Sequence, residues 1–175
     1  MIQFKENDTI SSPMEKSRQT ERMTPEKAPF YAKGLKFSCK RCSSCCRYDS
    51  GFVFISENDL KRLSAALKMD KDGFIKTYCR WVPSVSENER LSLREKSNKD
   101  CILWDNGCTV YESRPVQCVS FPFWESVLSS NEAWEMAASA CPGMNCGTLH
   151  SEEEILAAKE MRKGQMIINR AGGDE

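Results

Sequence analysis

The chain has 175 residues, which is enough for one domain with a hydrophobic core but short for two. Lysine plus arginine total 25 and aspartate plus glutamate also total 25, so the charge balance disfavours nucleic acid and anionic membranes as partners. No stretch reaches the roughly 18 apolar residues of a membrane-spanning helix, and the first ten residues lack the apolar segment of a secretory signal. We therefore expect a cytoplasmic protein without a membrane partner, and a protein partner stays open.

The N-terminal residues 1–33 are polar, contain three prolines and show no apolar periodicity, which predicts a disordered arm. A cysteine-cluster metal-binding domain is expected over residues 34–148. It is followed by a helix packed on the domain within residues 149–170 and by a tail at 171–175.

The first part of the domain predicts a strand and two helices. Residues 52–55 are apolar and predict a short strand, and Ser56 with Asp59 matches a capping box at the start of a helix. Residues 71–81 predict a second short helix with Cys79 in the core.

The middle of the domain predicts a strand, a hairpin and a short helix. Residues 89–95 alternate between polar and apolar, as strands do. Residues 101–111 place Asp-Asn-Gly between two apolar arms, which predicts a hairpin with Cys101 and Cys108 on opposite flanks. Pro115 is expected in the first turn of a short helix, where its missing N–H costs little.

The last third predicts one more strand and the C-terminal helix. Residues 133–139 fit a strand or a helix, and we favour a strand. Ser151 and Glu154 form a second capping box, which predicts a helix to about Ile168, with His150 in the linker before it. Together these elements predict a small α+β domain stapled by metal, with short strands, a hairpin, a few helices and a C-terminal helix.

The chain has ten cysteines, and cytosolic thiols are kept reduced, so metal binding is favoured over a disulfide framework. Cys39, Cys42 and Cys45 repeat a Cys-x2-Cys spacing, which places three thiolates close together and is shared by ferredoxin-type iron-sulfur loops. Neighbouring side chains point in different directions, so the adjacent Cys45 and Cys46 suggest two centres side by side.

Four cysteines further along the chain bring the number of candidate ligands to eight, the number that two four-thiolate sites require. The expected metal ligands are Cys39, Cys42, Cys45, Cys46, Cys101, Cys108, Cys118 and Cys141. Zinc, as up to two ions, is favoured slightly, and iron or an iron-sulfur cluster stays open. Because the ligands are spread over a hundred residues, the metal is expected to be mainly structural.

The segments "CKRCSSCCR", "CILWDNGCTVYESRPVQCVSFPF" and "CPG" resemble the YkgJ-type cysteine-cluster family, CxxCxxCC proteins described as zinc- or iron-chelating domains. The resemblance covers about residues 37–145 and implies the same eight ligands, with Cys79 and Cys146 outside the pattern. It also implies a bacterial, cytoplasmic protein. The family often has an arginine after the third downstream cysteine, where this chain has Val119, so no role for that arginine carries over.

The predicted metal centre allows two alternative functions. In the first, a closed structural zinc centre supports a metal-binding module. In the second, an iron-sulfur cluster or an open metal position makes the protein an oxidoreductase or, as the resemblance implies, a protein-lysine methyltransferase-like enzyme. Enzymatic activity stays undecided, since a single histidine and the lack of a glycine-rich cofactor loop give no support for catalysis by this chain alone. Arg114 is expected to have a structural role near the thiolates, with anion binding as the alternative.

Overall fold

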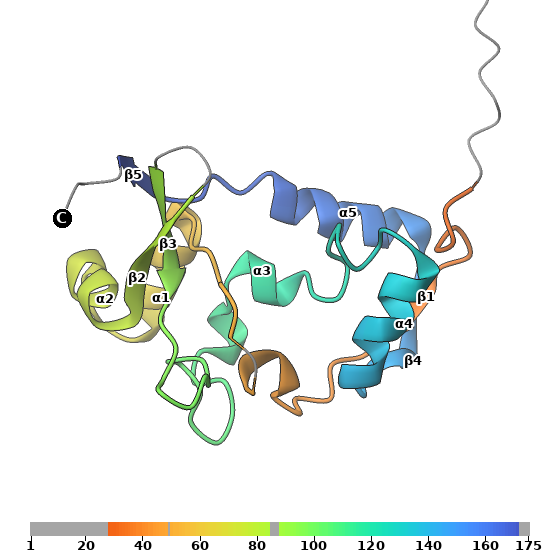
Figure 1. Cartoon of the computed structure of the whole chain (residues 1–175), viewed down its shortest axis with the longest axis horizontal. Coiled ribbons are helices and arrows are strands. Elements are labelled where there is room, and N and C mark those ends of the chain that lie inside the picture. Colours follow the sequence, from red (N-terminus) through yellow and green to blue (C-terminus); the bar gives the residue numbers. More distant parts are fainter. Residues whose placement is uncertain (1–27, 49, 85–87, 172–175) are drawn as a thin grey trace, which may run out of the picture.

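The computed structural model describes residues 28–48, 50–84 and 88–171. In this part of the chain it contains five α-helices and two small antiparallel sheets, which confirms the predicted α+β class (Figure 1). The predicted arm at 1–33 and tail at 171–175 fall for the most part outside the described residues. None of the described helices is both long enough and apolar enough to cross a membrane.

One side of the molecule, here called the three-stranded half, is built on an antiparallel sheet of order β2-β3-β5. Its elements are α1 (Glu57–Ala66), α2 (Lys71–Tyr78), β2 (Cys79–Pro83), β3 (Asn88–Leu93) and β5 (Asn169–Ala171). Its core comprises Ile55, Leu60, Leu63, Phe74, Cys79, Leu91, Leu93, Leu103 and Val110. Cys79 is therefore a core residue, as predicted.

The other side, the two-stranded half, has a separate core. Its elements are β1 (Leu35–Phe37), α4 (Asn131–Ala140), β4 (Met144–His150) and α5 (Glu152–Lys163). Its buried residues are Phe123, Leu128, Trp134, Met144 and Ile155. Phe30 and Tyr31, at the end of the predicted arm, pack against this core.

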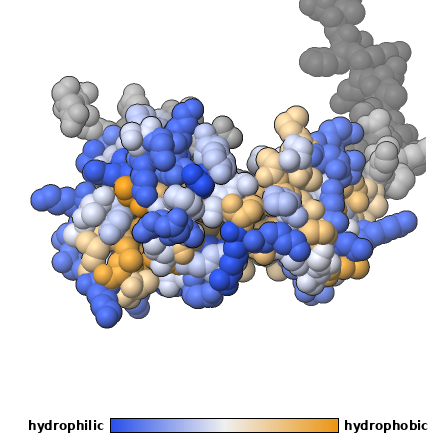
Figure 2. Space-filling view, turned by 90° about the horizontal axis from the view of Figure 1, so that it is seen from below, coloured by the Kyte–Doolittle hydropathy of each residue, from blue (hydrophilic) through white to orange (hydrophobic). Residues whose placement is uncertain are grey.

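The C-terminal segment connects the two halves. In Figure 1, α5 runs along the top of the molecule from the two-stranded half towards the sheet that β5 joins. Short α3 (Val116–Val119) lies in the middle, and the 3-10 helix η1 (Ser44–Cys46) lies below it. In the view from below, hydrophilic and hydrophobic residues are interspersed over both halves, and the molecule narrows between them (Figure 2). The cysteine-bearing loops are thus concentrated between two separate cores.

Both predicted capping boxes are present. The Ser56 side chain accepts from the Asp59 N–H while the Asp59 carboxylate accepts from the Ser56 N–H, and Ser151 and Glu154 make the same reciprocal pair. Each pair satisfies two backbone donors that the first turn of a helix leaves unpaired. The predicted second helix is also present, as α2.

The C-terminal helix ends at Lys163, earlier than the predicted Ile168. The reason is tertiary pairing, because Ile167 forms a bridge with Ser56 and the Ile168 N–H donates to the Ile55 carbonyl at 3.0 Å. Residues after the helix therefore adopt an extended conformation.

The predicted strand at 133–139 is wrong, because this segment lies in α4. The Ser130 side chain caps the helix by accepting from the Ala133 N–H. Trp134, Ala137 and Ala138 recur at helical spacing and pack into the core of the two-stranded half. The strand nearby is β4, and it ends with His150, which pairs with Leu35 and is therefore not a linker residue.

The expected hairpin at 101–111 and the expected strand at 52–55 each form only a single bridge. The Asp-Asn-Gly turn forms, with Asn106 and Gly107 at positive φ, but its arms pair only at Trp104 and Cys108. Beside this bridge, the Thr109 N–H and hydroxyl both donate to the Leu103 carbonyl. The start of the first arm pairs instead with the segment after β3, because Cys101 forms a bridge with Glu95 and the Ile102 N–H donates to the Arg94 carbonyl at 3.1 Å. The segment at 52–55 is extended and makes one bridge to β3, between Phe54 and Ser92.

Candidate metal centre

The first four predicted ligands lie on the loop that follows β1. Arg41 and Ser43 have positive φ values of 52° and 66°, so the chain turns sharply between the cysteines. The Arg41 N–H lies 3.5 Å from the Cys39 Sγ, and the Cys42 thiol donates to the Ser44 hydroxyl at 3.4 Å. The loop therefore reverses its direction between the cysteines.

The Sγ atoms of Cys45 and Cys46 lie 3.8 Å apart. The hydrogen bond from Cys46 lowers the pKa of Cys45 to about 6, and the same bond, with burial, raises the pKa of Cys46. In a tetrahedral site with metal–sulfur bonds of about 2.3 Å, neighbouring sulfur atoms lie about 3.8 Å apart, and the separation of this pair matches that distance. The pair is close enough to bind one ion, so its division between two centres stays a prediction.

Six of the predicted ligands line one cavity of about 260 Å³, here called the six-thiol cavity. They are Cys39, Cys45, Cys46, Cys101, Cys108 and Cys118. The Cys101 N–H donates to the Cys46 carbonyl at 2.7 Å, which joins the cysteine loop to the three-stranded half. Thiols separated by up to 79 positions in the sequence thus line the same cavity.

A second cavity of about 330 Å³, the four-thiol cavity, lies on the side of the two-stranded half. Its thiols are Cys39, Cys42, Cys45 and Cys141. Cys141 is the C-cap residue of α4, and Phe121 and Trp124 form apolar walls. All eight predicted ligands line one or both cavities, whereas Cys79 and Cys146 line neither.

The thiols do not form a closed cage as they stand. Among the described residues, no group of three or more cysteine, histidine, aspartate or glutamate side chains is positioned to hold an ion. Thiolate donors are nevertheless the chemistry that zinc and iron favour. The residues on the cavity walls fit such a metal by their chemistry, and binding requires their side chains to turn inward.

Burial affects the protonation of the downstream thiols. It raises the pKa of Cys101, Cys118 and Cys141, so these groups are neutral thiols near pH 7 in the metal-free protein. Thiolates are the ligand form, and metal binding at these groups therefore releases protons.

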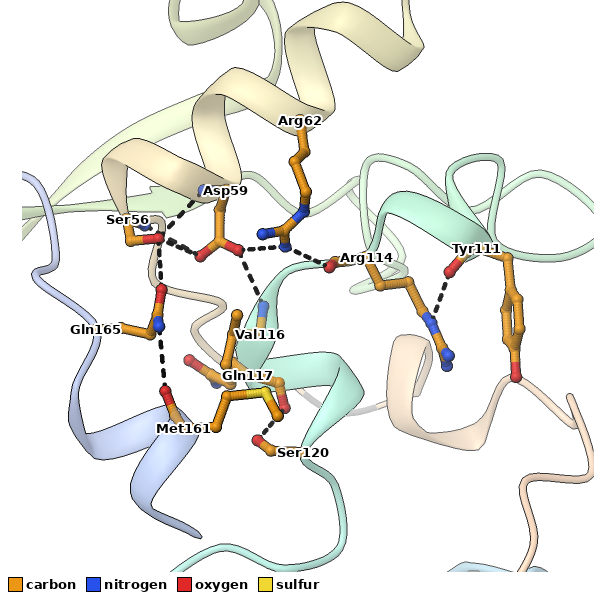
Figure 3. Close-up of polar contacts among 10 residues, drawn as sticks. All are labelled: Ser56, Asp59, Arg62, Tyr111, Arg114, Val116, Gln117, Ser120, Met161 and Gln165. Atoms are coloured by element: carbon orange, nitrogen blue, oxygen red, sulfur yellow. Dashed lines mark hydrogen bonds and ion pairs between the residues drawn. The ribbon is translucent and has the colours of Figure 1, made fainter. Parts of the chain in front are cut away.

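Cations and aromatic rings surround the six-thiol cavity. The guanidinium groups of Arg41 and Arg114 lie 4.0 and 3.6 Å from the centre of the Tyr111 ring, and all three residues line the cavity. The Arg114 Nε donates to the Tyr111 carbonyl at 2.7 Å (Figure 3). Arg114 thus has the structural contacts expected of it, beside the thiols. The positive charge of Arg114 offsets the negative charge of thiolates in the cavity.

Asp59 positions the helix that carries Cys118, a role that the sequence did not reveal. Its side chain is 1% exposed and accepts from Ser56, from Arg62 at 2.7 Å and from the Val116 N–H at 3.0 Å (Figure 3). Val116 is the first residue of α3, so one carboxylate caps two helices. The only signal in the sequence was the capping box of α1, because Val116 lies 57 positions away.

Gln117 makes a second connection to α3. Its side chain donates to the Phe52 carbonyl at 2.6 Å and accepts from the Phe54 N–H at 3.2 Å. Gln117, which makes both contacts, directly precedes Cys118 in the chain. The helix that carries this thiol is therefore held from two sides by polar contacts to the three-stranded half.

Comparison with known proteins identifies the family of the chain. A comparison with solved structures found no match. The family model CxxCxxCC, described as "Putative zinc- or iron-chelating domain", matches residues 38–142, which is more than half of the chain. These residues contain all eight predicted ligands. The chain therefore belongs to the CxxCxxCC family.

Proposed function

We propose that the protein binds two neighbouring metal ions, with four thiolates for each. Zinc is the favoured metal. The first group is Cys39, Cys42, Cys45 and Cys141, and the second is Cys46, Cys101, Cys108 and Cys118. The observation that supports this division best is the lining of the cavities, because every member of a group lines the same cavity.

The metal has a mainly structural role in this proposal. The ligands come from both halves, whose cores are separate, and the cysteine loop contacts the three-stranded half through the Cys101 N–H and Cys46 carbonyl. A metal bound there adds its binding free energy to the association of the two halves. Saturated thiolate ligation leaves zinc no open position for a substrate.

Metal analysis of anaerobically purified protein tests the proposal. We expect a colourless protein with about two zinc ions per chain, since two four-thiolate sites hold one ion each. A brown protein with stoichiometric iron and sulfide would instead support the alternative, an iron-sulfur redox protein. Fully folded protein that binds neither metal after anaerobic reconstitution would contradict both.

A further inference from the structure

We propose that a second site, on the three-stranded half and separate from the predicted metal ligands, binds a small phosphate-class anion. A cavity of about 450 Å³ lies beside the end of α2 and the edge strand β2. Its charged lining residues are Lys76, Arg80, Glu89, Arg94 and Arg170. None of the eight predicted metal ligands lines it.

This cavity concentrates positive charge in a chain that is formally neutral. Four cations line it, from α2, β2, the residue after β3, and β5. Two carboxylates offset them, because Glu89 pairs with Arg170 and Glu95 pairs with Arg80 at 3.0 Å. Among the residues that the structure describes, four cations minus two carboxylates leave two positive charges, which suits a dianion.

Arg80 lines the cavity, but its guanidinium group faces another way. Its Nη2 atom donates to Glu95 at 3.0 Å and lies 3.4 Å from the Gly51 carbonyl, and the guanidinium carbon lies 5.3 Å from the centre of the Phe52 ring. None of these three partners lines the cavity. The Arg80–Glu95 pair therefore adds no net charge, and we assign the contacts with the anion to Lys76, Arg94 and Arg170.

Two other guanidinium groups are held in place by the fold. The Arg94 Nε donates to the Cys79 carbonyl at 2.5 Å, and the Arg170 guanidinium lies 4.5 Å from the centre of the Trp81 ring. Planar guanidinium groups with several N–H donors match the oxygen atoms of phosphate. Burial also raises the pKa of Cys79 to about 12, so its thiol adds no negative charge.

Titration calorimetry of the full-length, metal-loaded protein at low ionic strength tests this site. The probes are inorganic phosphate and glycerol phosphate. We expect saturable binding of at least one, because surface electrostatics are least screened at low salt. Tighter binding of glycerol phosphate identifies an organic phosphate as the ligand, and tighter binding of inorganic phosphate identifies the free anion.

Matched variants make the test specific. Lys76→Gln and Arg170→Gln should each weaken binding about tenfold, the effect of losing one charge-assisted contact, whereas Lys61→Gln on the exposed face of α1 should not. Glu89→Gln should tighten binding, because it releases Arg170 from its carboxylate partner. A merely structural role for Glu89 predicts no such gain.

The proposal is overturned if neither probe saturates up to about 10 mM, a weaker interaction than a built site gives. It is also overturned if Lys61→Gln weakens binding as much as Lys76→Gln. Metal content is measured on the same samples. If the anions do not bind but about two metal ions are present, only the anion site is contradicted. If an anion binds but the metal is absent, only the metal proposal is contradicted.

Discussion

The cysteine side chains of this protein fall into two sets. The eight predicted ligands line the cavities between the halves, whereas Cys79 is part of a core and the Cys146 thiol donates to the Pro142 carbonyl at 3.3 Å. Local spacing in the sequence does not distinguish the sets, because Cys141 and Cys146 are only five positions apart. Their different surroundings predict different effects of substitution on metal content.

Replacing one thiol of each group tests the division of the ligands. Cys42→Ser and Cys118→Ser should each remove about one metal equivalent, because a hydroxyl is a poor replacement for a soft thiolate ligand. Elemental analysis of the purified variants measures this.

Cys146→Ser is the matched control and should keep the full metal content. If Cys42→Ser or Cys118→Ser also keeps it, the assigned group is wrong. Loss of both equivalents in either variant would favour one joint cluster over two separate ions.

Asp59 accepts from the first residue of α3, the helix that carries Cys118. Asp59→Asn keeps the shape but removes the charge that accepts from Arg62 and Ser56. We expect the free energy of unfolding to fall by about 2–4 kcal/mol, the cost of breaking a buried charged network. Urea unfolding of the metal-loaded protein measures this change.

Asp72→Asn is the control for this substitution, because Asp72 is exposed in the first turn of α2. It should change stability by no more than about 0.5 kcal/mol. Equal changes in the free energy of unfolding for the two substitutions would show that the contacts of Asp59 do not stabilise the fold more than an exposed carboxylate does.

At the scale of elements, helix α4 shows how a cap and a buried face determine a short ambiguous segment. Trp134 is 1% exposed, its ring stacks on Phe123 at 6.2 Å, and its indole N–H donates to Asn145 at 2.7 Å. The helix ends at Ala140 and Cys141 is its C-cap residue, so the position of α4 determines where this predicted ligand lies. The stability of α4 therefore bears directly on the four-thiol cavity.

Removal of the α4 cap is a mild test of this dependence. Ser130→Ala should lower the free energy of unfolding by about 1 kcal/mol, the usual cost of losing an N-cap side chain. Thermal unfolding followed by circular dichroism measures it. Ser126→Ala, at an exposed position before the helix, should leave stability unchanged, and a larger loss there than at Ser130 would contradict the capping role.

At the scale of the whole molecule, two separate cores meet at the cysteine-bearing loops. Each core is small, and α5 together with β5 forms the other connection between the halves (Figure 1). A metal at the junction would therefore make the unfolding of the two halves more cooperative.

Metal removal tests this coupling. A strong chelator should lower the free energy of unfolding by several kcal/mol, because structural metal binding is folding free energy. Hydrogen exchange should increase first at residues 39–48 and 101–120. An unchanged melting temperature and unchanged exchange after complete metal removal would contradict a structural role.

Much of the fold and of the candidate site could be predicted from local patterns. The two capping boxes, helix α2 and the Asp-Asn-Gly turn depend on residues within a few positions of one another, and the structure contains them all. The cysteine pattern likewise identified the family, because its spacing is a property of the chain itself. These features needed no knowledge of the packing.

Only the tertiary structure decided the rest. Segment 133–139 is a helix because its apolar face meets a core. The first arm of 101–111 pairs at its start with the segment after β3, and Asp59 accepts from the first residue of a helix 57 positions away. The two cavities also exist only because α3, α4 and the cysteine loop come together. Each outcome depends on contacts between residues far apart in the chain, and such contacts leave no local pattern in the sequence.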